Sequence, residues 1–285
     1  VGESGCGKSV TTLSVMGLLP ENGAVRSGSI KLCGEELLGM SPRQLGQVRG
    51  KKMGMIFQEP MTSLNPLLTI GYQLTEGLRQ HLGMSKAEAR ATAVSYLEKV
   101  GIANAEERMK QFPFQLSGGL RQRIMIAMMM SLQPRLLIAD EPTTALDVTI
   151  QKQVLLLLNR LKQDMKTGIL FITHDLGVVA QIADRVIVLY SGSKVEEGAT
   201  RQIFENPLHP YTNGLIAAVP NVDSDEFEIR PIPGTFPSIT EEIGGCRFHP
   251  RCPYATERCR QEVPQALEYE PGHFVACHKV EEENK

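Results

Sequence analysis

"GESGCGKS", residues 2–9, is the stretch of sequence that decides the fold. It has a glycine, four free positions and then Gly-Lys-Ser, which completes the P-loop pattern for phosphate binding. The glycines let backbone N–H groups turn towards phosphate oxygens, Lys8 supplies a positive charge, and Ser9 can bind Mg²⁺. Helix-compatible residues follow as far as Pro20, so we expect the phosphates at a helix N-terminus. The predicted nucleotide contacts of this loop are Gly2, Glu3, Ser4, Gly5, Cys6, Gly7, Lys8, Ser9 and Val10.

The composition is that of a globular protein with one or two domains. Of 285 residues, 42% are hydrophobic, and the net charge of −2 argues against broad, sequence-independent binding to nucleic acid. No apolar run approaches the roughly 18 residues needed to cross a bilayer, so we expect any membrane association to go through a partner. The chain opens directly on the P-loop, a motif that normally follows a strand, and we expect this chain to lack that strand.

Two apolar runs further along the chain end on polar residues. "LLIADEP" at 136–142 is typical of a buried parallel strand that delivers carboxylates at its C-terminal edge, where ligands bind in open α/β sheets. Asp140 is then a candidate ligand of Mg²⁺, and Glu141 is a candidate for polarising the attacking water. The second run, "GILFITHD" at 168–175, places His174 where it could sense the γ-phosphate or serve a purely structural role.

Between these runs lies "LSGGLRQR" at 116–123, and with it the pattern becomes specific. The chain resembles the ATP-binding subunit of an ABC transporter over residues 1–220. This resemblance implies an α/β fold: a RecA-like P-loop domain with an antiparallel β subdomain and a helical subdomain at about 60–135. It rests on an ordered set of motifs: the P-loop, Gln58, Leu116-Ser117-Gly118-Gly119, Asp140-Glu141, Ala145-Leu146-Asp147 and His174.

The same resemblance implies roles for these residues. In the family, two nucleotide domains pack head to tail, as a homodimer or a heterodimer. Ser117, Gly118 and Gly119 of one subunit would then contact the ATP held by its partner, and Asp147 also belongs to the nucleotide site. The catalytic residues implied are Glu141, His174, Gln58 and Lys8. The Mg²⁺ ligands implied are Ser9, Gln58 and Asp140. The aromatic residue that stacks on adenine would precede the chain, which by itself is expected to bind ATP poorly.

Two further stretches favour one branch of the family. "FQEPMTSLNPLLTIGYQL" at 57–74 and "NPLHPYTNGLIAAVP" at 206–220 resemble the dipeptide, oligopeptide and nickel importers. The resemblance implies an ATP-hydrolysing motor, peripheral on the cytoplasmic face of the membrane. Its partners would be integral membrane permease subunits and, indirectly, an external solute-binding protein. The alternatives are an importer of nickel or another small solute, a soluble ABC ATPase acting on ribosomes or nucleic acid, and a catalytically silent assembly subunit.

The remaining pattern predicts the organisation of the chain. Short β-like runs over 20–56 predict a small antiparallel subdomain, and "KAEARATAVSYLEKVG" predicts a helix that buries Ala89, Ala93 and Tyr96 on one face. "ADRVIVLYSGSKVEEG" reads as two strands around a Ser-Gly-Ser turn. A proline-rich linker near 221–235 separates the predicted ATPase domain (1–220) from a C-terminal extension (221–285).

The extension carries four cysteines, Cys246, Cys252, Cys259 and Cys277, spaced C-x5-C-x6-C-x17-C. Disulfides are unexpected in the reducing cytosol, and four thiolates suit Zn²⁺ or an iron–sulfur cluster. The wide spacing favours a 4Fe-4S cluster over zinc, with unliganded thiols as the third alternative. The tail is also similar to that of some peptide-importer ATPases in which the equivalent segment holds a 4Fe-4S cluster. His249, His273 and His278 are rival ligands.

Overall fold

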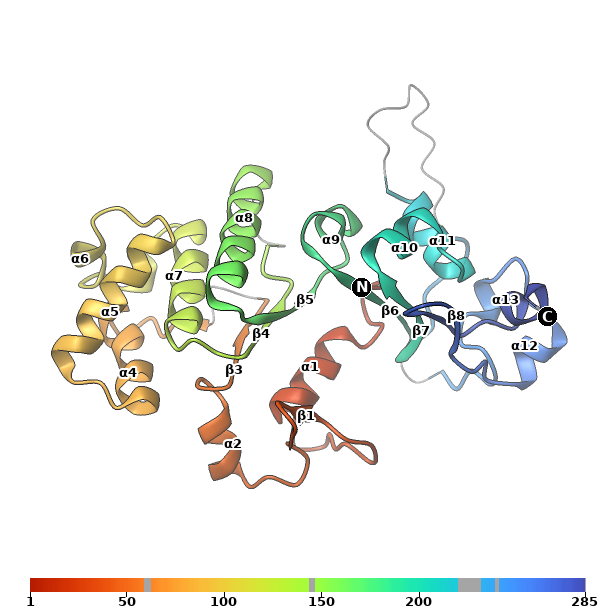
Figure 1. Cartoon of the computed structure of the whole chain (residues 1–285), viewed down its shortest axis with the longest axis horizontal. Coiled ribbons are helices and arrows are strands. Elements are labelled where there is room, and N and C mark those ends of the chain that lie inside the picture. Colours follow the sequence, from red (N-terminus) through yellow and green to blue (C-terminus); the bar gives the residue numbers. More distant parts are fainter. Residues whose placement is uncertain (59–62, 144–146, 220–231, 239–240, 285) are drawn as a thin grey trace. The chain divides into compact units, whose positions relative to one another are not determined.

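The computed structural model describes residues 1–58, 63–143, 147–219, 232–238 and 241–284. The chain forms two compact units (Figure 1). We call residues 9–172 the helical unit, and residues 1–8 together with 173–285 the C-terminal unit. Outside the described residues lie parts of three predicted features: 59–62 of the stretch 57–74, Ala145 and Leu146 of the motif that ends at Asp147, and 220–231 around the linker.

A parallel sheet runs through the helical unit. Its strands are β3 (Met53–Ile56), β4 (Leu136–Asp140) and β5 (Gly168–Ile172), in the order β3-β4-β5. The register pairs Met53 with Leu136 and Leu136 with Gly168, so the strands run level and their carboxyl ends meet at one edge. That edge is where open α/β sheets bind ligands. The predicted α/β fold is confirmed.

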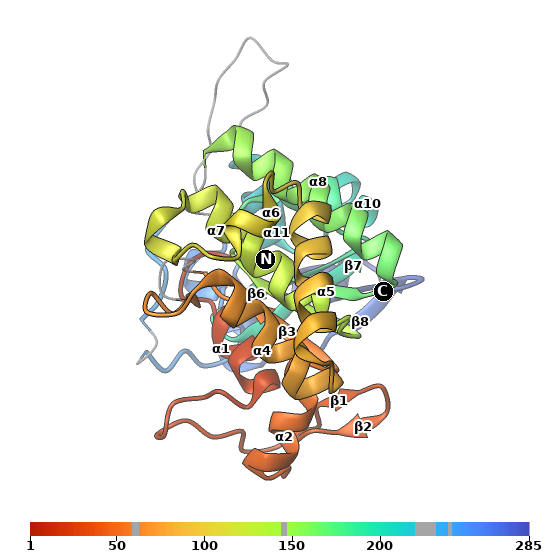
Figure 2. The same ribbon diagram turned by 90° about the vertical axis from the view of Figure 1, so that its left-hand side faces the viewer.

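One helix of this unit, α7 (Gly118–Ser131), packs against β3, and other helices pack in turn against α7. Serine and threonine caps start three of the described helices: Ser41 forms a capping box with Gln44, Thr69 accepts the N–H of Tyr72, and Ser85 forms a capping box with Glu88. α4, α5 and α7 pack against one another (Figure 2). The helices are α1 (Lys8–Met16), α2 (Pro42–Val48), α4 (Ile70–Leu82), α5 (Lys86–Lys99), α6 (Ala105–Arg108), α7 (Gly118–Ser131) and α8 (Val148–Met165), with a 3-10 turn at Pro113–Gln115.

Helix burial follows the predicted pattern. Ala89, Ala93 and Tyr96 are buried on one face of α5, as the sequence predicts. The methionine-rich run of α7 belongs to the same core cluster, with Met125 and Met130 almost fully buried. The methionines of this apolar helix are therefore core residues, because the helix is buried on several sides.

The predicted antiparallel subdomain over 20–56 is confirmed only in part. β1 (Lys31–Leu32) and β2 (Glu35–Glu36) pair antiparallel. At the end of this predicted stretch, Met53–Ile56 instead form β3 and pair parallel with β4, so this part of the prediction is wrong. Every residue of β3 is buried, because a parallel strand is covered on both faces, and this burial overrides the local hairpin pattern.

An antiparallel sheet organises the C-terminal unit. Its order is β6-β7-β9-β8, with β6 (Arg185–Tyr190), β7 (Ser193–Ala199), β9 (His273–Val275) and β8 (Leu267–Glu270). The predicted turn between β6 and β7 is confirmed: Ser191 and Gly192 have φ of 43° and 77°, as a type I′ hairpin requires. β9 pairs with β7, so residues on both sides of the predicted linker share one sheet. The predicted domain boundary itself stays a prediction.

Short helices flank this sheet. They are α9 (Leu176–Ile182), α10 (Thr200–Glu205), α11 (Pro210–Ala217), α12 (Glu257–Gln261) and α13 (His278–Glu283), with a 3-10 turn at His249–Arg251. A buried aromatic cluster lies among them. Tyr190 of β6 meets Tyr211 of α11 edge to face, with ring centroids 4.7 Å apart, and Phe248 packs against both rings. This cluster joins the start of α11 to the cysteine-containing segment.

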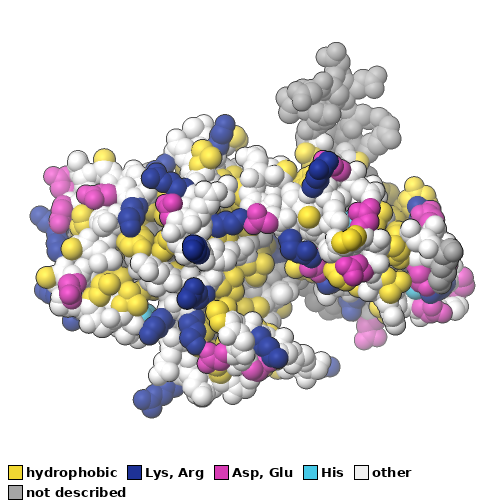
Figure 3. All heavy atoms as spheres, in the orientation of Figure 1, with side chains coloured by type: hydrophobic (Ala, Val, Ile, Leu, Met, Phe, Trp, Pro, Cys, Tyr) yellow, Lys and Arg dark blue, Asp and Glu magenta, His cyan; other side chains and the backbone are white. Residues whose placement is uncertain are grey.

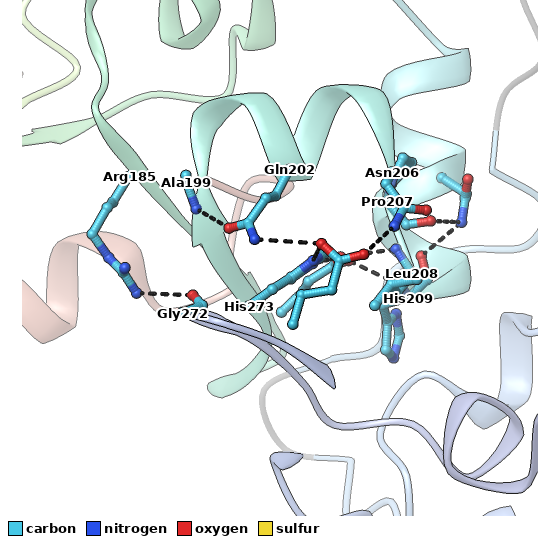
Figure 4. A network of polar contacts seen from close by, with 12 residues as sticks. Arg185, Ala199, Gln202, Asn206, Pro207, Leu208, His209, Gly272 and His273 are labelled. Carbon is cyan, nitrogen blue, oxygen red and sulfur yellow. Dashed lines mark hydrogen bonds and ion pairs between the residues drawn. The ribbon is translucent and has the colours of Figure 1, made fainter. Parts of the chain in front are cut away.

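A buried polar network fixes the loop before α11 (Figure 4). The carboxylate of Glu196 on β7 accepts the backbone N–H groups of Leu208 at 2.8 Å and His209 at 3.0 Å. His273 of β9 places its Nε2 2.8 Å from the same carboxylate. Glu196 and His273 are almost fully buried, so the network connects β7, β9 and the "HPY" segment 209–211.

The surface carries both signs of charge. Figure 3 shows Lys and Arg side chains interspersed with Asp and Glu side chains over both units, in line with the net charge of −2. In the part of the chain that the structure describes, no helix is both long and apolar enough to cross a membrane.

Candidate functional site

The P-loop turn begins alongside β6 in the C-terminal unit. The backbone of Val1 hydrogen-bonds to Ile187 and to Leu189, and Gly192 donates its N–H to the carbonyl of Cys6 at 2.8 Å. At Gly2 only glycine fits: its φ is 149°, and an added Cβ would lie 2.2 Å from the carbonyl oxygen of Leu189. The loop is thus shaped by its close approach to β6.

Lys8 folds back over its own loop. Its Nζ donates to the carbonyls of Gly2 at 2.7 Å and Glu3 at 3.0 Å, and only 7% of the residue is exposed. Gly5 and Gly7 have positive φ, of 83° and 101°, which turns the backbone between them. The exposed members of the predicted contact set are Ser4, Gly5 and Val10.

Two predicted contacts face protein instead of solvent. Cys6 is fully buried, with its Sγ 3.8 Å from Lys8 Nζ. Glu3 donates its backbone N–H to the hydroxyl of Tyr211 at 2.9 Å, and its carboxylate pairs with Arg251 at 2.7 Å. No pattern in the sequence indicates a role for Tyr211 or Arg251 at the P-loop. The "HPY" stretch at 209–211 indicates only which branch of the family the chain resembles.

The predicted Mg²⁺ ligands Ser9 and Asp140 meet in the helical unit. Ser9 lies in the first turn of α1, and its hydroxyl donates to Oδ1 of Asp140 at 3.2 Å. Asp140 is the last residue of β4 and is 5% exposed, so the carboxylate sits at the carboxyl edge of the sheet. A hydroxyl and a carboxylate are hard oxygen donors of the kind that Mg²⁺ prefers, so these residues fit the ion.

Glu141 and Gln58 also come together at this edge. Nε2 of Gln58, which follows β3, donates to Oε2 of Glu141 at 3.1 Å. Glu141 has φ of 44°, and its N–H donates to the carbonyl of Ile172 on β5. A left-handed backbone at a non-glycine residue costs free energy and is typical of functional positions. The strand end therefore holds the Glu141 side chain in a defined position.

The signature segment lies at the start of α7. Ser117 is the N-cap residue, yet its hydroxyl makes no capping hydrogen bond, and Ser117 and Gly118 are exposed. Leu116 is buried and anchors the turn. A Cβ on Gly119 would lie 3.1 Å from Cγ2 of Ile150, so this glycine allows α7 to approach α8 closely.

Asp147 has a structural function that the sequence analysis missed. Its carboxylate accepts the N–H of Ile150 at 2.9 Å and caps α8. An aspartate directly before a helical run, which begins here at Val148, is the signal that could have indicated this. His174 is exposed and lies two residues beyond β5, in the C-terminal unit.

Comparison with known proteins identifies the family. Residues 1–144 match the family described as ABC transporter, and residues 195–259 match the Oligopeptide/dipeptide transporter, C-terminal region. The chain is also similar to the Oligopeptide transport ATP-binding protein AppD of Bacillus subtilis, with 51% identity over 284 residues, covering 99% of this chain and 87% of that protein. The chain belongs to the ATP-binding proteins of ABC transporters, oligopeptide/dipeptide type. The predicted family is confirmed.

Other ABC ATP-binding proteins support the same assignment. The Oligopeptide transport ATP-binding protein OppD of Salmonella typhimurium is 50% identical over 283 residues, covering 99% of this chain and 84% of that protein. The Dipeptide transport ATP-binding protein DppD of Bacillus subtilis is 49% identical over 278 residues, covering 97% and 83%. Among solved structures, a dimeric post-hydrolysis state of the ATP-binding cassette MJ0796 with ADP and Pi gives a TM-score of 0.61 at 29% identity. It covers 70% of this chain and 83% of that one.

The four cysteines of this ABC protein lie in one neighbourhood. Burial raises the pKa of the Cys246 thiol to about 11, with smaller contributions from the nearby thiols of Cys259, Cys277 and Cys252. Burial also raises the pKa of Cys252 and of Cys277. Backbone N–H groups hydrogen-bond to these three sulfurs: those of Phe248, Tyr254, Lys279 and Val280.

The fit of this neighbourhood to a metal group is partial. The thiols converge, and backbone N–H donors favour their charged form, but burial outweighs these donors and favours the neutral thiols. Among the described residues, however, no three His, Cys, Asp or Glu side chains are arranged to hold a metal ion. His273 and His278, two of the rival ligands, bond instead to Glu196 and to the carbonyl of Glu262.

Proposed function

We propose that this chain is the ATP-hydrolysing subunit of an importer for di- or oligopeptides. The proposal rests on two hydrogen bonds at the carboxyl edge of one parallel sheet. One joins Ser9 to Asp140, and the other joins Gln58 to Glu141. The substrate class rests on the match of residues 195–259 to the oligopeptide/dipeptide transporter region and on the names of the relatives.

Each of these residues has a role in hydrolysis. The P-loop N–H groups and Lys8 hold the β- and γ-phosphates, which carry the negative charge. Ser9, Asp140 and Gln58 would hold Mg²⁺, which neutralises charge on the phosphate oxygens when it is bound. Glu141 accepts a proton from the attacking water, and Gln58 orients that carboxylate through its 3.1 Å hydrogen bond. His174 contacts the γ-phosphate.

The subunit acts as a head-to-tail dimer with a second ABC ATPase. Ser117, Gly118, Gly119 and Asp147 complete the site of the partner. Support comes from the exposure of Ser117 and Gly118 and from the uncommitted hydroxyl of Ser117 at the start of α7. The dimer binds permease subunits at the cytoplasmic face of the membrane, and these receive solute from an external binding protein. Closure on ATP and reopening after hydrolysis drive the permease.

We also propose that Cys246, Cys252, Cys259 and Cys277 hold a 4Fe-4S cluster that organises the C-terminal segment. The convergence of the thiols, their burial and the N–H donors to sulfur support it. Iron and acid-labile sulfide, measured after anaerobic purification of the full-length protein, test the idea. We expect about four of each per chain, a loss of both in Cys246→Ser, and no change in the control Cys33→Ser. One zinc without sulfide would contradict the cluster.

The transport function is tested by the ATPase rate of the complex reconstituted with its permease and binding protein. We expect a peptide-loaded binding protein to raise the rate of phosphate release, and Ni²⁺ in place of peptide to leave it at the basal value. The variant Glu141→Gln is the control for contaminating ATPases. Stimulation by Ni²⁺ but not by peptides would contradict the peptide assignment while leaving the ATPase intact.

A further inference from the structure

The C-terminal segment holds the P-loop through an ion pair with Glu3. Nη1 of Arg251 lies 2.7 Å from Oε2 of Glu3, and Nη2 lies 3.2 Å from Oε1. Both partners belong to the C-terminal unit, although 248 positions separate them in the chain. The arginine side chain is 5% exposed and that of Glu3 is 30% exposed, so the bidentate contact is partly shielded from water.

Arg251 is itself held firmly. Its Nε donates to the carbonyl of Pro233 at 2.9 Å, and Nη2 also reaches the carbonyl of Ile232 at 3.4 Å. The guanidinium group lies 5.9 Å from the centre of the Tyr190 ring. A guanidinium fixed by carbonyls and an aromatic ring presents its fork to Glu3 with little freedom left to lose.

Tyr211 holds the same P-loop residue by its backbone. The hydroxyl of Tyr211 accepts the N–H of Glu3 at 2.9 Å, and the tyrosine is fully buried. Its ring packs against Tyr190 and Phe248, with centroids 4.7 Å and 5.3 Å away. Burial raises the pKa of the Tyr211 hydroxyl, which therefore stays neutral. Glu3 is thus fixed at both its backbone and its side chain.

Glu3 transmits this restraint to the phosphate-binding groups. Its carbonyl accepts Lys8 Nζ at 3.0 Å and the N–H of Cys6 at 3.3 Å. Its carboxylate places a negative charge in a loop that must bind an anion, and such a charge repels phosphate unless it is compensated. Arg251 supplies the compensating charge from outside the loop.

We infer that Arg251 and Tyr211 are positioning residues of the nucleotide site, which hold the P-loop turn through Glu3 and cancel the charge of its carboxylate. The inference rests on the proposed function, since it requires the P-loop to bind ATP. It makes the C-terminal segment part of the nucleotide site, acting through the loop without touching the nucleotide.

The test is titration of the full-length protein with the fluorescent nucleotide trinitrophenyl-ATP. Loss of a charge-assisted hydrogen-bonded pair predicts that Arg251→Ala weakens binding by roughly tenfold or more. Tyr211→Phe, which keeps the ring and loses the hydroxyl, should weaken binding by about three- to tenfold. The matched control is Arg258→Ala: Arg258 lies in the same segment and pairs with Glu262 and Glu281, and its loss should leave affinity unchanged.

A second substitution distinguishes a positioning role of Arg251 at the P-loop from a role in the folding of the C-terminal segment. In Glu3→Gln/Arg251→Ala no uncompensated carboxylate is left in the loop, so nucleotide binding should be tighter than in Arg251→Ala alone. Wild-type affinity in both Arg251→Ala and Tyr211→Phe would overturn the inference. So would a loss in Arg251→Ala that Glu3→Gln does not relieve, because that would mark a purely structural arginine. Failure of the wild-type protein to bind the nucleotide would instead refute the proposed function on which the inference rests.

Discussion

The side-chain amide of Gln58 donates a 3.1 Å hydrogen bond to the carboxylate of Glu141, 83 positions further along the chain. The two residues follow neighbouring parallel strands, β3 and β4, whose carboxyl ends meet at one edge. The left-handed backbone at Glu141, with φ of 44°, adds a second restraint on the carboxylate. The pair places a candidate general base beside a candidate Mg²⁺ ligand.

Replacing the carboxylate of Glu141 should separate binding from hydrolysis. We expect Glu141→Gln to lower the rate of ATP hydrolysis by about 10²- to 10⁴-fold, because general-base catalysis contributes a factor of this size. Nucleotide affinity should stay near the wild-type value, since the P-loop is untouched. Phosphate release and nucleotide titration measure the two effects. The control is Glu98→Gln on the exposed surface of α5, and an active Glu141→Gln would remove Glu141 from the mechanism.

The contact between Ser9 and Asp140 predicts a change in the need for Mg²⁺. We expect Asp140→Asn to raise the Mg²⁺ concentration at half-maximal ATPase activity by about tenfold, because a neutral amide is a weaker ligand for a hard cation. Titration of the steady-state rate with Mg²⁺ at saturating ATP measures the shift. An unchanged titration midpoint in Asp140→Asn would speak against a magnesium site at this edge.

The pH dependence of stability should depend on His209. Burial lowers the pKa of His209 from 6.5 to about 3, while its ring nitrogen accepts the N–H of Tyr211. Between pH 6.5 and pH 3 the His209 side chain is protonated in the unfolded chain but neutral in the folded chain. The free energy of unfolding is therefore not reduced by His209 above about pH 6.5, and it decreases as the pH falls towards 3. One such group should cost about 2 kcal/mol between pH 7 and pH 5.

The variant His209→Asn keeps an acceptor for the helix start and removes the titrating group. We expect the free energy of unfolding of His209→Asn to fall less steeply than that of the wild type over this pH range. Urea unfolding at pH 7, 6 and 5 measures the slopes. Parallel slopes in the two proteins would show that His209 is not the group responsible.

The Glu196 network predicts a stability difference between neighbouring glutamates. Glu196 is 1% exposed and accepts two backbone N–H groups, so Glu196→Gln should lower the free energy of unfolding by about 1–3 kcal/mol. Glu197 pairs with Arg185 and Lys194, whose side chains are about half exposed, and Glu197→Gln should cost less than about 1 kcal/mol. Urea unfolding measures the free energy of unfolding of both variants. An equal decrease in Glu196→Gln and Glu197→Gln would contradict the role of the buried network.

Much of the site could be predicted because its signals are local. A glycine pattern, a strand that ends on acids and an amphipathic helix are each visible in a short window, so the P-loop, Asp140-Glu141 and the buried face of α5 are foreseeable. The parallel pairing of β3 was not foreseeable, because the partner strand β4 begins 83 positions after Met53. Arg251 and Tyr211 were missed for the same reason: their partner Glu3 lies 248 and 208 positions away.

Uptake of a labelled peptide into vesicles tests whether this chain couples ATP hydrolysis to peptide import. The complete transporter is reconstituted into vesicles with a labelled peptide and its binding protein outside and ATP inside. We expect peptide accumulation that requires ATP and disappears when Glu141→Gln replaces the wild-type subunit. Accumulation that persists without ATP, or that Glu141→Gln supports as well as the wild type does, would contradict it.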